Sequence, residues 1–129
     1  MRTPWTTVQA IDDERDYVLV VTELVPRTMR STGPLFRGAR AASAQIAAAP
    51  GIVGFATSAK PLAKRYETVS LWEDEAAVDA FARSGDHHRL VRDLAPALVS
   101  TTSSRSRRPG AAGRPSWSEA RALLSTSPT

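Results

Sequence analysis

The strongest constraint on the fold is the apolar run from Tyr17 to Val25, with the sequence Tyr-Val-Leu-Val-Val-Thr-Glu-Leu-Val. The run is rich in β-branched residues and nearly continuous in apolar character, which is typical of a strand buried on both faces. Pro26 ends it. A sheet that contains such a strand needs an apolar cover on each side, and this requirement limits the architectures open to the chain.

The remaining elements follow from alternation, helical recurrence and breakers. Further strands are predicted over residues 52–59, 65–73 and 98–107. One helix is predicted from residue 32 or 33 to residue 49, where Pro50-Gly51 stops it. A second is predicted over 74–83, a further helical segment over 87–94, and a C-terminal helix over 116–124 with Ser116 and Glu119 at capping-box spacing.

This order predicts a ferredoxin-like α+β fold, βαββαβ, with an added C-terminal helix. Such a sheet carries its helices on one face, so the simplest cover for the other face is a second copy of the chain. We therefore expect a homodimer whose sheets face each other, a dimeric α/β barrel. Within the 129 residues, 1–16 is expected to be a leader that packs loosely or in part, 17–124 the single domain, and 125–129 a tail.

Composition excludes several classes of function. The chain has no cysteine, which excludes disulfides, thiolate catalysis and Cys-ligated metal centres. Its apolar runs are far shorter than the ~20 residues of a membrane span, so no membrane partner is expected. The N-terminus lacks the apolar core of a signal peptide, and we expect a cytoplasmic protein.

The basic charge is concentrated near the C-terminus. The net charge is +4, with arginines at positions 105, 107, 108, 114 and 121 in a stretch rich in Ser, Pro and Gly. Nucleic-acid binders cluster such charge on one face among aromatic residues, and this stretch lacks that pattern. We expect a solvated tail and no nucleic-acid partner.

One stretch resembles a known family. A strand ends at Leu71-Trp72, an acidic cluster opens a helix that contains Phe81, and the stretch closes on Ser84-Gly-Asp-His-His. This order resembles the antibiotic-biosynthesis-monooxygenase-like superfamily of dimeric α/β barrels. An arginine-containing loop over 27–33, Pro-Gly-Ile-Val-Gly-Phe over 50–55, and the tail Pro-Ser-Trp-Ser-Glu-Ala over 115–120 are most similar to uncharacterised relatives of spheroidene monooxygenase.

The resemblance implies a small monooxygenase-like oxidoreductase that acts on an aromatic or polyketide-type metabolite in secondary metabolism. It also has departures. Haem-degrading members of the superfamily carry the motif Trp-x-x-Ser followed by an axial histidine. At the corresponding positions this chain has Phe81, Ser84 and Val91. It contains no asparagine, which those members carry on the first strand.

The two histidines are the candidate catalytic residues. His87 and His88 are adjacent, so on a helix they point about 100° apart and at most one faces a cavity. That one is expected to be a general base or, if haem is bound, its axial ligand. An adjacent pair with no third ligand nearby is a poor metal chelate, so we expect no metal and no cofactor, with haem as the alternative.

Strand 65–73 provides candidate substrate-binding residues. Tyr66, Ser70 and Trp72 share one face by the period of two, and that face is more polar than a plain core requires. With Phe55 and one histidine they are expected to line a cavity between the helices and the sheet. On strand 52–59, small residues leave room for something to pack on the sheet: Gly54, Ala56 and Ser58.

Three charged residues complete the candidates. Arg27 and Arg30 lie in the loop after the first strand, and we expect them to close over an anionic or quinone-like ligand. Glu23 interrupts an apolar strand; it is either a general base or the partner of one of these arginines. Gln45 is predicted to lie away from the apolar face of the first helix.

Four functions remain open from the residues alone. They are a cofactor-independent oxygenase, a haem-dependent oxygenase, a non-oxidative cyclase, isomerase or dehydratase, and a non-catalytic dimeric binding protein. All four fit the same fold, because fold does not determine function.

Overall fold

The computed structural model describes residues 2–28, 32–60 and 65–126. Its centre is a five-stranded antiparallel sheet in the order β1-β3-β4-β2-β5. The strands are β1 (Thr6–Thr7), β2 (Asp16–Pro26), β3 (Ile52–Lys60), β4 (Arg65–Trp72) and β5 (Leu98–Pro109). The helices are α1 (Thr32–Ala47), α2 (Glu75–Arg83), α3 (Gly85–Leu94) and α4 (Trp117–Thr126), with short 3-10 helices η3 (Ala95–Ala97) and η4 (Gly110–Ala112).

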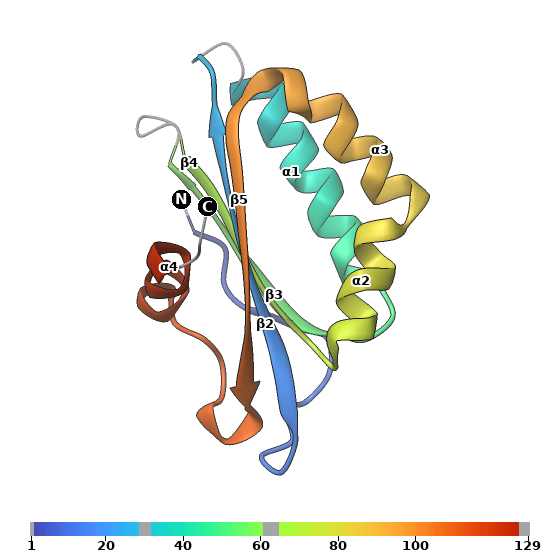
Figure 1. Ribbon diagram of the computed structural model, residues 1–129, viewed down its shortest axis with the longest axis vertical. Coiled ribbons are helices and arrows are strands. Elements are labelled where there is room, and N and C mark those ends of the chain that lie inside the picture. Colours follow the sequence, from blue (N-terminus) through green and yellow to red (C-terminus); the bar gives the residue numbers. More distant parts are fainter. Residues whose placement is uncertain (1, 29–31, 61–64, 127–129) are drawn as a thin grey trace.

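The predicted βαββαβ order with a C-terminal helix is confirmed, and the fold is ferredoxin-like. The added strand β1 extends the sheet beside β3. It belongs to the segment that we expected to pack loosely or in part. Figure 1 shows α1, α2 and α3 on one face of the sheet and α4 on the other. No helix within the described residues is long and apolar enough to cross a lipid bilayer.

Side-chain caps fix where the helices begin. Asp74 Oδ1 accepts a hydrogen bond of 2.8 Å from the Ala77 N–H at the start of α2. Ser84 ends α2 and caps α3, where its Oγ accepts from the His87 N–H at 3.4 Å. These caps satisfy N–H groups that have no partner inside the helix. The turn at Ser84 therefore places His87 in the first turn of α3.

The start of α4 is the predicted capping box. Ser116 Oγ accepts from the Glu119 N–H and Glu119 Oε1 accepts from the Ser116 N–H, each at 3.1 Å. This reciprocal arrangement satisfies two backbone donors at once.

An apolar cluster on the helix-covered face lies between α1, α2 and the sheet. Its buried members are Val18, Ile46, Ile52, Phe55, Trp72 and Val78. Phe81 and Val20 pack against them and are only partly buried. The layer is therefore incompletely filled on its β2 and α2 side.

The opposite face is covered by the chain itself, and this corrects the expected cover by a second copy. Its cluster includes Tyr17, Leu19, Val21, Val69 and Leu71. The N-terminal segment and α4 pack on it with Trp5, Ile11, Trp117, Leu123 and Leu124. The apolar side chains of α4 thus pack on the sheet of their own chain.

Gly54 shows why small residues occupy this face of β3. A Cβ at Gly54 would lie 2.4 Å from the Trp5 ring, so only glycine admits the indole there. Sequence alternation predicted that something would pack on the sheet at this place.

Three of the C-terminal arginines lie on a strand and have carboxylate partners, instead of belonging to a solvated tail, which is a second correction. Arg105, Arg107 and Arg108 lie on β5, and they pair with Glu75 and Asp79, with Asp16, and with Glu119 respectively. Arg108 is buried and also donates to the carbonyl oxygens of residues 112, 113 and 114. The last strand runs to Pro109 because β2 provides a pairing partner along that length.

Candidate functional site

A pocket of about 290 Å³ lies between the three helices and the sheet. β2, β4 and β5 provide its floor, and α1, α2 and α3 provide the other walls. The lining is mainly apolar. It consists of Val20, Thr22, Leu24, Ala42, Ile46, Thr68, Ser70, Trp72, Val78, Phe81, Ala82, His87, Leu90, Val91, Leu94, Ala95, Leu98, Thr101, Ser103 and Arg105.

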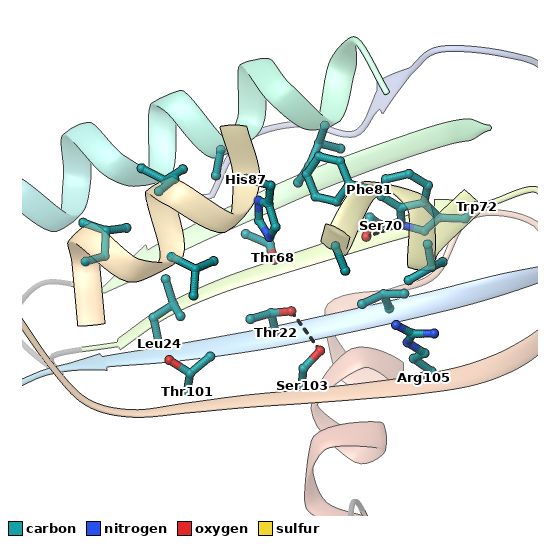
Figure 2. A pocket seen from close by; sticks show the side chains of 18 of the residues that line it. Thr22, Leu24, Thr68, Ser70, Trp72, Phe81, His87, Thr101, Ser103 and Arg105 are labelled. Atoms are coloured by element: carbon teal, nitrogen blue, oxygen red, sulfur yellow. Dashed lines mark hydrogen bonds between the residues drawn. The ribbon is translucent and has the colours of Figure 1, made fainter. Parts of the chain in front are cut away.

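His87 is the titratable group best placed in this pocket. It extends from α3 toward Thr68 on the sheet (Figure 2). Its ring packs against Phe81, with the ring centroids 4.3 Å apart. Its Nδ1 lies 3.3 Å from Gln45 Oε1 on α1. Burial lowers the pKa of His87 from its ordinary value of 6.5, because the charged imidazolium loses hydration.

With Gln45 Oε1 oriented toward the ring, the contact selects one tautomer of His87. An amide oxygen only accepts hydrogen bonds, so Nδ1 carries the proton in this pair. In the neutral ring Nε2 then keeps a free lone pair. The lowered pKa keeps the ring neutral near pH 7. Nε2 is therefore available to accept a proton, while Gln45 holds Nδ1.

Trp72 forms one end of the pocket. Its side chain is 2 % exposed, and its Nε1 donates to Ser70 Oγ at 2.8 Å. The Trp72 and Phe81 ring centroids lie 5.2 Å apart in a tilted arrangement. The indole N–H is already bonded, so Trp72 can offer a ligand its aromatic face and no free donor.

Polar groups line the β5 side of the pocket. The hydroxyls of Thr22 and Ser103 lie 3.3 Å apart (Figure 2). Arg105 Nη1 donates to Glu75 Oε2 and Asp79 Oδ1, each at 2.8 Å, and ties β5 to α2. The hydrogen bond to Asp79, aided by that to Glu75, raises the pKa of Arg105 against the opposing effect of burial. Two carboxylates therefore neutralise the cation.

The structure brings together three of the residues predicted from the sequence. Ser70, Trp72 and His87 line this one pocket. Phe55 lies in the core cluster with Trp72 and is absent from the lining. Tyr66 lines a second cavity beside the first. His88 is exposed, as expected for one of two adjacent helical residues.

The charged candidates lie elsewhere. Glu23 is on the α4 side of the sheet, where its carboxylate pairs with Arg65 at 3.1 Å and not with a loop arginine. Its position follows from the period of two, since its neighbours Thr22 and Leu24 line the pocket. Arg27 is exposed, and its Nε donates to the Pro96 carbonyl at 3.1 Å. Arg30 lies outside the described residues.

Sequence reasoning missed Gln45 and Arg105. Gln45 was expected to lie away from the apolar face, yet it is partly buried and contacts His87. It precedes Ile46 and follows Ala42 by three positions, which places it at the margin of their helical face. Arg105 shares a strand face with Ser103 and Thr101, and this alternation was a usable signal.

The lining residues match some of the requirements of a haem site and lack others. His87 Nε2 suits an axial ligand, since Gln45 orients the other nitrogen. The propionates need cations, and the one cation among the described lining residues, Arg105, is already bonded to two carboxylates. The lining therefore does not fit haem. Within the described residues, no group of three or more His, Cys, Asp or Glu residues could hold a metal ion.

Comparisons with known proteins give structural likenesses only. No family model matches the chain, and no curated protein matches it. A dimeric ferredoxin-like protein of unknown function from Thermobifida fusca superposes with a TM-score of 0.63 and 16% identity, over 76% of this chain and 96% of that one. A protein named antibiotic biosynthesis monooxygenase gives a TM-score of 0.56 and 17% identity, over 69% and 95%.

A candidate monooxygenase from Lactobacillus acidophilus NCFM gives a TM-score of 0.63 and 11% identity over 80% of this chain. This chain spans about half of that protein, 49% of its length. At such identities the likeness concerns the fold and not the chemistry. The chain thus has the ferredoxin-like fold that proteins named as monooxygenases also have.

Proposed function

We propose that this protein is a small monooxygenase-like oxidoreductase that acts on an aromatic or polyketide-type metabolite in secondary metabolism. The pocket is mainly apolar and of a size for a small flat molecule, and its described lining includes one neutral base, His87. The observation that carries the proposal is the contact between His87 Nδ1 and Gln45 Oε1 at the pocket wall. The fold shared with proteins named as monooxygenases supports the reaction class.

In the proposed reaction, His87 Nε2 accepts the proton of a phenolic O–H on the bound substrate. The apolar walls exclude water and hold the ring against Trp72 and Phe81. The phenolate passes one electron to dioxygen, and the resulting phenoxyl radical and superoxide combine to form a carbon–oxygen bond. The peroxide then takes up the proton from His87 and loses water to give a quinone. The substrate is oxidised, dioxygen is reduced, and no resident cofactor is required.

The decisive experiment compares His87→Gln with His88→Gln. These neighbours differ in that the first lines the pocket and the second is exposed. Turnover of a panel of naphthols and hydroxyanthracenes is followed by product formation and by oxygen uptake. We expect His87→Gln to lower kcat about 100-fold or more, the usual contribution of a general base, and His88→Gln to leave it unchanged.

The other outcomes identify the competing functions. Product formation without oxygen uptake would indicate a non-oxidative cyclase, isomerase or dehydratase. Binding without turnover would indicate a binding protein. A Soret band on addition of haem that His87→Gln abolishes would restore the haem-dependent function.

The pH profile tests the role of Gln45. Because burial lowers the pKa of His87, the acid limb of kcat/KM is expected below pH 6.5. Gln45→Glu places a carboxylate beside Nδ1 and is expected to move that limb to higher pH. Gln45→Leu removes the hydrogen-bond partner of Nδ1 without adding a charge. It should lower kcat but should not move the acid limb to higher pH. Identical profiles for all three proteins would contradict the assigned base.

We further propose that the protein is a cytoplasmic homodimer. A neighbour of the same fold is named as dimeric, which supports this assembly. The α4 cover makes face-to-face pairing at the Tyr17 cluster impossible unless α4 moves. Sedimentation at micromolar concentration tests the dimer, and a monomer there would contradict it.

A further inference from the structure

A second cavity of about 390 Å³ adjoins the first. The two share four lining residues, namely Leu24, Ala42, Thr68 and Leu94. Residues from four different elements, α1, α3, β2 and β4, thus face both spaces. The two cavities are neighbours along the same gap between the helices and the sheet.

The face of β4 beneath the helices orders the two cavities along the strand. Trp72 and Ser70 line the first cavity, Thr68 lines both, and Tyr66 lines the second. Trp72 and Tyr66 lie six positions apart, so the row spans roughly 20 Å at the rise of an extended strand. A single aromatic ring covers only a small part of that length.

Tyr66 has an unsatisfied polar group at the far end of this row. The residue is 3 % exposed, and its hydroxyl has no hydrogen-bond partner within the described residues. Its surroundings are apolar and include Leu35 and Leu98. A buried hydroxyl without a partner is costly, so a group that bonds to it on ligand binding would gain more than at an exposed site.

Leu94 lies at the boundary between the two cavities. Its side chain lines both cavities and packs on α1 at Gly38, where an added Cβ would lie 2.6 Å from Leu94 Cδ1. Gly38 thus lets α3 approach α1 closely, and Leu94 is one of the four residues that line both spaces. A leucine side chain can change rotamer without moving the backbone.

We propose that the second cavity is a distal subsite for the far end of an elongated, largely apolar ligand. The ligand has one oxygen at His87 and a second hydrogen-bonding oxygen at Tyr66 Oη. Leu94 yields to the body of the ligand between them. This inference rests on the proposed function, because it takes His87 as the near end of the same site. It adds a second contact site beyond the first cavity and a residue that selects for ligands that reach it.

The test uses two probes that differ only at the far end. Both 2-hydroxyanthraquinone and 2,6-dihydroxyanthraquinone have the same three-ring body, and the second has a hydroxyl at each end. Kd is measured by fluorescence quenching for wild type and Tyr66→Phe. We expect Tyr66→Phe to weaken the dihydroxy probe about fivefold and to leave the monohydroxy probe unchanged, since one neutral hydrogen bond is lost.

The chain contains a matched control, because its two tyrosines lie on opposite faces of the sheet. Tyr17 is 3 % exposed on the α4 side, and its hydroxyl accepts from the Asp12 N–H at 2.8 Å. Tyr17→Phe should change neither Kd. Leu94→Phe fills the boundary and should weaken both three-ring probes while 2-naphthol, which fits the first cavity alone, still binds.

The outcomes separate the two proposals. Equal effects of Tyr66→Phe on both three-ring probes, or none on either, would overturn the distal subsite while the His87 kinetics still test the proposed reaction. If Leu94→Phe leaves both three-ring probes unaffected, the cavities are not used together and the inference is wrong. If no probe binds wild type, both the subsite and the proposed aromatic pocket are overturned.

Discussion

The two faces of the sheet are built from the same strands but differ in how completely they are filled. On the helix side, β4 presents Thr68, Ser70 and Trp72 to a pocket of about 290 Å³. On the α4 side, it presents Val69 and Leu71 to a cluster closed by Trp5 and Trp117. The first face combines hydroxyls with empty space, and the second is a packed core.

This difference indicates which face can do chemistry. A ligand needs unfilled volume and a few oriented polar groups, and the helix side has both. The α4 side has polar groups too, but packing covers them. Glu67 is 1 % exposed, and its Oε2 lies 3.9 Å from Arg121 Nε on α4. Neither carboxylate oxygen has a hydrogen-bond partner within the described residues.

The largest effect is expected from a truncation that disrupts only the α4 side of the sheet. Truncation after Arg114 removes the cover from the cluster and also removes Glu119, the carboxylate partner of Arg108. Exposing a buried large apolar side chain costs about 1.5–3 kcal/mol, so uncovering several of them removes a large share of the stability of a small domain. We expect a sharply lower Tm or a new association of the exposed face, measured by thermal unfolding and sedimentation. An unchanged Tm and mass would show that α4 is an appendage.

The next effect concerns the charge pair under α4. Arg121→Met leaves Glu67 buried without its countercharge and is expected to lower the free energy of unfolding by about 3 kcal/mol. The double variant Glu67→Met/Arg121→Met removes both charges and should recover at least that loss. Urea unfolding of the two variants decides this. A double variant no more stable than the single one would mean that Glu67 contributes through contacts other than the pair.

Arg108 tests how β5 holds the segment that leads to α4. Its guanidinium bonds three carbonyls and Glu119 while 8 % exposed. Arg108→Met leaves those acceptors without a hydrogen-bond donor. It should lower the free energy of unfolding, measured with urea, by about 2–3 kcal/mol. Its neighbour Arg107 pairs with Asp16 but is 80% exposed, so Arg107→Met should cost about 0.5 kcal/mol or less. Equal losses of stability in the two variants would contradict the expectation that the burial of the arginine decides the cost.

A smaller effect tests the capping box. Ser116→Ala removes the acceptor for the Glu119 N–H and should lower stability by about 1 kcal/mol. The control is Ser118→Ala, because Ser118 lies two residues further along the chain and is exposed. We expect the loss of Ser116 to increase amide exchange in α4 and to leave exchange in α3 unchanged. Faster exchange in both helices would argue that the two faces are coupled.

The smallest effect on stability comes from the pocket face and depends on pH. Because burial lowers the folded-state pKa of His87, the unfolded chain binds the proton first as the pH falls. Wild type should therefore lose stability relative to His87→Gln as the pH drops below 6.5, and the two should differ by a constant amount above it. Urea midpoints between about pH 8 and pH 5 measure this. The opposite slope would mean that a partner raises the pKa of His87.

Local sequence was sufficient for most elements. Asp74 caps α2 at the expected start, Ser84 starts α3 two residues before the expected position, and Ser116 with Glu119 forms the predicted box. The strand order of the ferredoxin-like unit follows from the element order, because hairpins and right-handed crossovers leave few alternatives. The adjacency of His87 and His88 already implied that one would be exposed.

Long-range packing decided the rest of the site. Gln45 and His87 are 42 residues apart, and only the α1–α3 contact brings them within 3.3 Å. Arg105 meets Glu75 and Asp79 because β5 lies beside α2 in space. No periodicity in one segment encodes such pairs, since each depends on how two elements dock.

The sequence by itself determined that both faces of β2 are buried, because Tyr17–Val25 has too few polar positions to face water. It did not determine what covers them. The tertiary structure assigned α4 and Trp5 to one face and three helices to the other. The choice depends on shape, because Gly54 admits the Trp5 ring on one side while the helices leave unfilled volume beside Trp72 on the other.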